Sequence, residues 1–165
     1  MESATKMLEN FVKYDESFYG KSCILILFLK DENKLNELFV NKNKINKIIN
    51  MIKTQENLLW IGRTNNSKFR IEDFYSSKKR ENSLQESIAQ LIAGVDIMDK
   101  EKEYLKIREK IAKWLFSNTK FYARLCSEFE ENDPEIIKKN LIKKHRFPFN
   151  RKYNKSNFNE ILFAE

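Results

Sequence analysis

The chain has 165 residues and a formal net charge of +7, and 41% of its residues are apolar and 13% aromatic. This length suits one domain with a buried core. Only three Gly and two Pro exclude a barrel or sandwich that needs many tight turns. The longest apolar run, Cys23–Leu29, is far shorter than the roughly 20 residues that span a bilayer, and it starts too far along the chain for a signal peptide. We therefore expect a mainly helical, cytoplasmic protein without a membrane partner.

Patterns for metal binding or catalysis are sparse. Cys23 and Cys126 lie in apolar segments without a Cys-x-x-Cys pair, and His145 is the only histidine. The sequence therefore predicts neither a zinc site nor a disulfide framework. The three glycines are too far apart for a loop that cradles a phosphate. We expect no cofactor and no metal.

The first half of the chain predicts a mixture of helices and strands. Residues 2–14 place apolar side chains at helical spacing and predict an amphipathic helix. The apolar run 23–29 predicts a buried strand, and residues 35–52 predict one helix, or two that are broken near 41–44. Residues 58–74 combine an apolar run, the turn sequence TNNS and an alternating pattern, so they predict a β-hairpin.

The second half predicts helices. After a polar stretch at 76–83, interpreted as a linker, Ser83 and Glu86 have the spacing of a capping box and start a helix. A charged helix follows from Asp99 to Ser117. The predicted fold class is α+β, mainly α, with a small α/β N-terminal half that holds the hairpin and a helical C-terminal half. The corresponding segments are 1–75, 83–147 and a basic and aromatic tail at 148–165, and the two halves can share one core.

The segment from Phe121 to Phe147 predicts a helix-turn-helix-like unit. Apolar spacing indicates a helix at 121–130, Asp133 is a good N-cap, and Pro134 is favoured in the first turn of the next helix. Lysines occupy the outer face of that second helix. Two short helices joined by a tight turn, the second of them basic, match the outline of a DNA-binding helix-turn-helix.

A second pattern runs through the same segment: a Trp-apolar-aromatic-Ser stretch, an aromatic residue, an apolar-Cys pair, Asp-Pro-Glu and a basic helix. Its positions are Trp114–Ser117, Phe121, Leu125–Cys126, Asp133–Glu135, Lys138–Lys139 and Leu141. In this pattern the chain resembles the C-terminal part of short helix-turn-helix proteins that phages and prophages encode. The resemblance implies DNA binding, with transcription regulation as the expected role.

Positive charge is concentrated after that Asp-Pro-Glu. Eight basic residues and no acidic one stand between Lys138 and Lys155, whereas positions 1–137 hold 23 basic and 22 acidic residues. A local positive field favours a polyanion, because each neutralised phosphate releases a condensed counterion. Aromatic residues interleaved with the cations also suit a nucleic-acid surface, and these are Phe147, Phe149, Tyr153 and Phe158. The residues predicted to bind nucleic acid, DNA before RNA, are Lys138, Lys139, Lys143, Lys144, Arg146, Arg151 and Lys152.

One segment raises the question of enzyme activity. The stretch WIGRTNNSKFR, Trp60–Arg70, resembles the second signature of the GIY-YIG nucleases, in which a Tyr-Ile-Gly-like strand and a polar turn precede an arginine. The resemblance implies that Arg70 would be that arginine. The upstream segment INMIKTQENLLW has no tyrosine to match the first signature. We therefore expect a protein that is not an enzyme, with a degenerate nuclease as the alternative.

A protein-interaction module is the second functional hypothesis. Under it the basic surface would bind an acidic host protein or a ribonucleoprotein. Phe158, Ile161, Leu162 and Phe163 have helical spacing, so they predict either a docking helix or homodimer contact, or a helix that folds back on the core.

Overall fold

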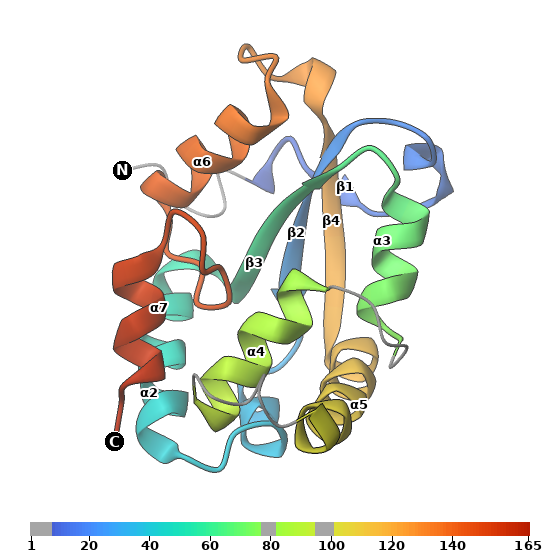
Figure 1. The fold of residues 1–165 in the computed structure, drawn as a ribbon. Coiled ribbons are helices and arrows are strands. Elements are labelled where there is room, and N and C mark those ends of the chain that lie inside the picture. Colours follow the sequence, from blue (N-terminus) through green and yellow to red (C-terminus); the bar gives the residue numbers. More distant parts are fainter. Residues whose placement is uncertain (1–7, 77–81, 95–100) are drawn as a thin grey trace.

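One antiparallel sheet organises the computed structural model, which describes residues 8–76, 82–94 and 101–165 (Figure 1). The strand order is β1-β4-β2-β3, so β4 and β2 are central and β3 is an edge strand. The strands are β1 (Val12–Lys13), β2 (Cys23–Leu29), β3 (Leu58–Thr64) and β4 (Thr119–Leu125).

Helices connect the strands, and several begin at a clear N-cap. Asn41, Asn82 and Asp133 each stand one residue before a helix, and their side chains accept hydrogen bonds from its first N–H groups. The helices are α2 (Lys42–Ile52), α3 (Ser67–Phe74), α4 (Ser83–Ala93), α5 (Glu101–Asn118), α6 (Pro134–Lys144) and α7 (Lys155–Leu162). Short 3-10 helices lie at η1 (Glu16–Phe18), η2 (Glu32–Glu37), η3 (Lys53–Gln55) and η5 (Cys126–Glu128).

The two predicted halves of the chain contribute strands to the same sheet. β4 comes from the second half, yet it pairs with both β1 and β2, and Ala123 lies opposite Leu25 in the antiparallel register. α3, α4 and α5 connect β3 to β4.

Both faces of the sheet are buried, which explains why β2 is apolar at every position. Leu25 and Leu27 face a large cluster with side chains from α2, α4, α5 and α7. Ile24 and Ile26 face a smaller cluster that includes Ile137 of α6. A strand that is buried on both faces is apolar throughout, because neither set of alternating side chains faces solvent. α6 therefore covers one face of the sheet, on the side away from α4 and α5 (Figure 1).

The predicted fold class, α+β and mainly α, is confirmed. Strands form at 23–29 and 58–64, and helices form where α4 and α5 were predicted. Residues 32–52 divide into η2 and α2, so the broken helix is the alternative that the structure adopts. Asn82, one residue before the predicted Ser83, is the N-cap of α4.

The hairpin predicted at 58–74 is wrong in its second half. β3 ends at Thr64, and residues 67–74 form α3. Ile71 and Phe74 are buried at helical spacing, whereas Phe69 is exposed. Phe69 and Ile71 alternate with charged residues in the sequence, but this short alternation falls within a helix and does not indicate a strand.

The helix predicted at 121–130 is also wrong, because residues 119–125 form β4. Alternate side chains of β4, Thr119, Phe121 and Ala123, are buried, as expected for a strand. A strand and η5 therefore precede α6, so these segments do not form the predicted pair of helices.

Two other predictions fall partly outside the described residues. Residues 2–7 of the predicted helix at 2–14 are not described, and Val12–Lys13 near its end form β1. The centre of the predicted linker, 77–81, is not described. No helix in the described ranges is both long enough and apolar enough to cross a membrane.

Candidate anion-binding cleft

α6 is fixed on the sheet by its cap and by its apolar side. The Asp133 side chain accepts hydrogen bonds from the N–H groups of Glu135 (2.9 Å) and Ile136 (3.4 Å), and Pro134 occupies the first turn as predicted. Ile137 and Leu141 are buried against the smaller cluster of the sheet. The remaining faces of α6 carry its lysines and one carboxylate, Glu135.

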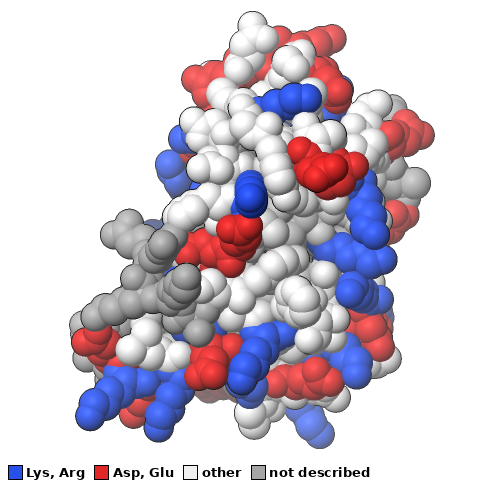
Figure 2. Space-filling model, turned by 90° about the vertical axis from the view of Figure 1, so that its right-hand side faces the viewer, with Lys and Arg blue, Asp and Glu red and all other residues white. Residues whose placement is uncertain are grey.

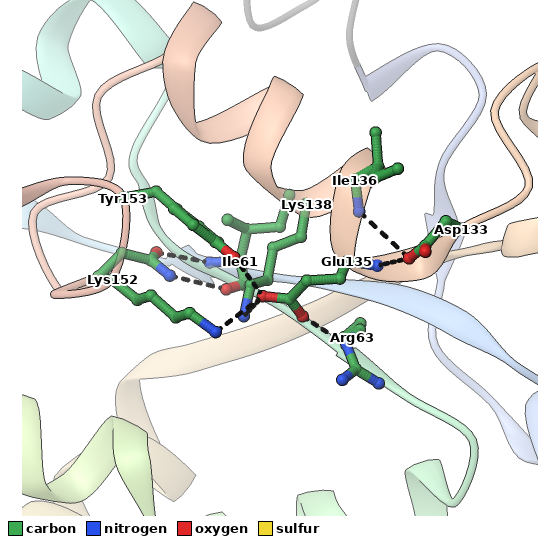
Figure 3. Close-up of polar contacts among 9 residues, drawn as sticks. Ile61, Arg63, Asp133, Glu135, Ile136, Lys138, Lys152 and Tyr153 are labelled. Carbon is green, nitrogen blue, oxygen red and sulfur yellow. Dashed lines mark hydrogen bonds and ion pairs between the residues drawn. The ribbon is translucent and has the colours of Figure 1, made fainter.

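Glu135 is the centre of a group of four donors (Figure 3). Arg63 Nε on β3 lies 2.6 Å from Oε2 of Glu135. Lys152 Nζ and the Tyr153 hydroxyl donate to Oε1, at 3.2 and 3.0 Å, and Lys138 Nζ lies 3.5 Å from the same oxygen. One carboxylate therefore connects the edge strand, α6 and the segment that follows α6.

These contacts shift the ionisation of the cluster. The hydrogen bond from Arg63 is the main reason that the pKa of Glu135 falls to about 2, and Lys152, Tyr153 and Lys138 act in the same direction. Burial lowers the pKa of Lys138, although Glu135 opposes that shift. The hydrogen bond to Glu135 raises the pKa of Lys152. Glu135 is therefore a carboxylate at neutral pH and balances part of the positive charge around it.

The segment after α6 lies along the outer edge of β3. The Asn150 side chain bonds to both main-chain groups of Ile61, and the Phe149 N–H donates to the Leu59 carbonyl at 3.0 Å. Asn154 donates to the carbonyls of Phe147 and Asn150, so the segment is held by buried polar contacts at several points. Arg151 and Lys152 follow directly on this anchored backbone.

A cleft of about 520 Å³ opens between β3, α4, α6 and this segment. Among the described residues, four cations and no carboxylate contribute to its wall. The lining residues are Trp60, Ile61, Arg70, Ser83, Ser87, Lys138, Asn150, Arg151 and Lys152. This composition favours an anion.

Arg70 enters the cleft from α3 beside two aromatic rings, Trp60 and Phe74, which pack edge to face against each other. Its guanidinium carbon lies 5.6 Å from the centre of the Trp60 ring and 5.4 Å from that of Phe74, which suits a cation–π contact. The indole of Trp60 lies across Gly62, where no Cβ would fit. Burial, and then the positive charge of Arg63, lower the pKa of Arg70. The arginine of the nuclease-like segment is thus held at the wall of the cleft.

A second pocket of about 350 Å³ adjoins the first, since Arg70 and Ser83 line both. Its wall also includes the carboxylates Asp73 and Glu86. The surface that carries α3 and α5 is mixed in charge, because Figure 2 shows Lys and Arg interspersed with Asp and Glu on that side. The two pockets therefore differ in electrostatic character, and the larger one is the cationic one.

The seven predicted binding residues fall into three groups. Lys138, Arg151 and Lys152 line the cleft, although Arg151 pairs with Glu86 (3.4 Å) and the two lysines pair with Glu135. Arg146 pairs with Glu160 of α7 (3.4 Å). The third group is exposed on α6, and its side chains form no ion pair with any described residue: Lys139, Lys143 and Lys144.

The aromatic residues of the tail mostly do not reach the surface. Phe147 and Phe149 are fully buried and Phe158 is nearly so, so their predicted place on a nucleic-acid surface is wrong. Tyr153 is the one of the four that is exposed, and Lys139 Nζ lies 5.5 Å from its ring centre. Ile161 is buried together with Phe158, so α7 folds back on the core, as one of the two alternatives predicted.

Sequence reasoning missed two members of the site. Arg63 and Glu135 are 72 positions apart in the chain, and no local pattern connects them. Within the described residues, no group of three or more His, Cys, Asp or Glu side chains is placed to hold a metal ion. Comparisons with protein families, curated proteins and solved structures found no match to this chain.

Proposed function

We propose that this protein binds nucleic acid, with DNA as the expected target, by contacting phosphates from the exposed face of α6. The observation that carries the proposal is the lysine row of α6, Lys139, Lys143 and Lys144, whose side chains form no ion pair with any described residue. Lys144 shares a pocket wall with the carboxylates Glu128, Glu130 and Glu131, so Lys139 and Lys143 are the more open members of the row. Lys139 and Lys143 are four residues apart and lie on one side of the helix, Lys144 follows Lys143 directly, and Lys138, next to Lys139 in the chain, lines the cationic cleft. Each phosphate they contact would release a counterion.

The proposal concerns phosphate contact rather than base recognition. Lysine acts as a point charge, whereas arginine provides the two-pronged donor that reads guanine. The outer face of α6 carries lysines, Asn140 and Ile136. The arginines close to this helix are each paired with a carboxylate: Arg63 with Glu135, Arg146 with Glu160 and Arg124 with Glu128. Such a surface positions a protein on a duplex and leaves sequence selection to other contacts.

The test is a fluorescence anisotropy titration of the full chain with labelled duplex DNA, single-stranded DNA and RNA of matched length, at low and at moderate salt. The expected result is saturable binding that weakens steeply with salt. Binding to duplex DNA should be at least as strong as binding to RNA. Absence of binding to all three at low salt would contradict the proposal.

A protein partner with an acidic surface is the second candidate. The observation that favours it is Ile136, which is exposed on the same helix as the lysines and adds an apolar contact to a cationic face. Polyglutamate is a suitable probe, because it provides carboxylates without phosphates. Tighter binding to polyglutamate than to duplex DNA at the same salt concentration would favour this candidate over the first.

A further inference from the structure

Arg70 differs from the other cations of the cleft in forming no ion pair with a described carboxylate, although the negative charge of Asp73 acts on it from a distance. Lys138 and Lys152 contact Glu135, and Arg151 contacts Glu86. Nε of Arg70 is buried, and no described group accepts a hydrogen bond from it. A buried charged donor without an acceptor costs more than an ordinary lost hydrogen bond. The cleft lies beside this guanidinium, so an anion bound there would offset its positive charge.

The surroundings of Arg70 favour an anion with several oxygens. Lys138 and Lys152 approach from α6 and from the segment after it, and Ser83 contributes a hydroxyl group from the first turn of α4, whereas the Ser87 hydroxyl already donates to the Ser83 carbonyl at 2.7 Å. The N-terminal end of a helix adds partial positive charge. A group that accepts hydrogen bonds in several directions can therefore meet donors from three sides of the cleft.

We propose that this cleft binds one phosphate group, with Arg70 as its main ligand and Lys138 and Lys152 as flanking cations. The volume of about 520 Å³ leaves space for the atoms attached to that phosphate. The phosphate can belong to a free nucleotide or to a nucleic-acid strand, since both present the same oxygens. The proposal does not depend on the lysine row of α6, which lies outside the residues that line the cleft.

The direct test is an NMR titration of the full chain with inorganic phosphate at constant ionic strength, with chloride as the balancing anion. The Nε–Hε signal of Arg70 reports on the buried donor itself, and the indole N–H of Trp60 reports on the cleft wall. We expect both signals to move in a saturable way with phosphate and not with chloride. Equal changes with chloride, or signals that stay unchanged with phosphate and with both nucleotide probes described below, would overturn the proposal.

Two substitutions separate a binding role from a structural one. Arg70→Gln removes the main ligand, and the expected loss of phosphate affinity is about tenfold or more. Because Arg70 also packs against Trp60 and Phe74, the exposed Lys152→Gln serves as a second variant that leaves this packing intact. Lys143→Gln, outside the cleft, is the control and should bind phosphate as the unaltered protein does. If Lys152→Gln also binds phosphate with unchanged affinity, the assignment of the cleft is wrong.

Three probes distinguish the source of the phosphate: inorganic phosphate, a 5′-mononucleotide and a dinucleotide whose only phosphate is the internal diester. Binding of the mononucleotide but not of the dinucleotide would assign the cleft to a terminal phosphate. Binding of the dinucleotide would assign it to a strand backbone. If none of the three probes binds, the cleft proposal is wrong. That result would not affect the proposed binding of duplex DNA through α6, which the anisotropy titration tests separately.

Discussion

The Asn150 side chain pairs with Ile61 as a neighbouring strand would. The Ile61 N–H donates to Oδ1 at 2.9 Å, and Nδ2 donates to the Ile61 carbonyl at 2.8 Å. Both residues are buried. Asn150 therefore satisfies two main-chain groups on the open edge of β3 and fixes the backbone that presents Arg151 and Lys152.

Asn150→Ala should lower the free energy of unfolding by about 2 to 4 kcal/mol, because two buried main-chain groups lose their partners. Urea unfolding, followed by circular dichroism, measures the change. Asn140→Ala on the exposed side of α6 is the control and should change stability by less than about 0.5 kcal/mol. A similar small effect at both positions would show that water replaces the Asn150 contacts without cost.

Glu135→Gln should remove a pH-dependent part of the stability. The pKa of Glu135 in the folded protein is about 2, below its usual 4.5. Its stabilising contribution is therefore fully present above about pH 4.5 and is lost as the pH falls through about 2. We expect the unaltered protein to be more stable than the variant at pH 6, and the difference to shrink as the pH is lowered. Denaturant unfolding of both proteins between pH 6 and pH 2 measures this difference, and a difference that is independent of pH would contradict the ion-pair cluster.

Gly62→Ala should disturb the wall of the cleft. A Cβ at position 62 would meet the indole ring of Trp60, so the ring must move or the strand must shift. Overpacking of this kind costs about 1 to 3 kcal/mol. Urea unfolding gives the stability, and near-ultraviolet circular dichroism reports on the environment of the tryptophans.

A double mutant tests whether this loss comes from the contact between Gly62 and Trp60. Trp60→Phe replaces the indole with a smaller ring, so the Gly62→Ala substitution should cost less in that background. Equal costs in both backgrounds would mean that the added methyl group acts on something other than the indole.

Both cysteines should resist alkylation in the folded protein. Cys23 is fully buried and Cys126 nearly so, and neither is in a disulfide. Burial raises the pKa of the Cys23 thiol to about 12, so almost no thiolate is present at neutral pH. Mass spectrometry after iodoacetamide treatment should find modification only when urea is added. Rapid modification of the native protein would contradict the burial of these residues.

The sequence predicted the elements whose signals are local. β2 has a continuous apolar run, and α6 begins with Asp133 and Pro134, which are specific for a helix start. β4 was missed because the spacing of Phe121 and Leu125 also fits one face of a helix. The segment forms a strand because it pairs with β2, almost a hundred residues earlier in the chain. Such long-range pairing overrides a weak local preference for a helix.

The candidate site was predictable only in part. The acid-free run identified Lys138, Arg151 and Lys152, which do line one cleft. The run is acid-free only along the chain, however, because folding brings Glu86 to Arg151 and places Glu135 next to both lysines. Such pairings depend on the fold and cannot be inferred from the linear order of charges.

The measurement that tests the central claim most directly is the salt dependence of duplex binding by two triple variants of equal net charge. One variant changes Lys139, Lys143 and Lys144 of α6 to Gln, and the other changes three exposed lysines of α5, which are Lys102, Lys106 and Lys110. If α6 contacts phosphates, its variant should lose affinity, and the slope of log K against log salt should become shallower by about 2 to 3. The α5 variant should keep the slope of the unaltered protein. Equal slopes for both variants would contradict the claim that the lysine row of α6 is the nucleic-acid interface.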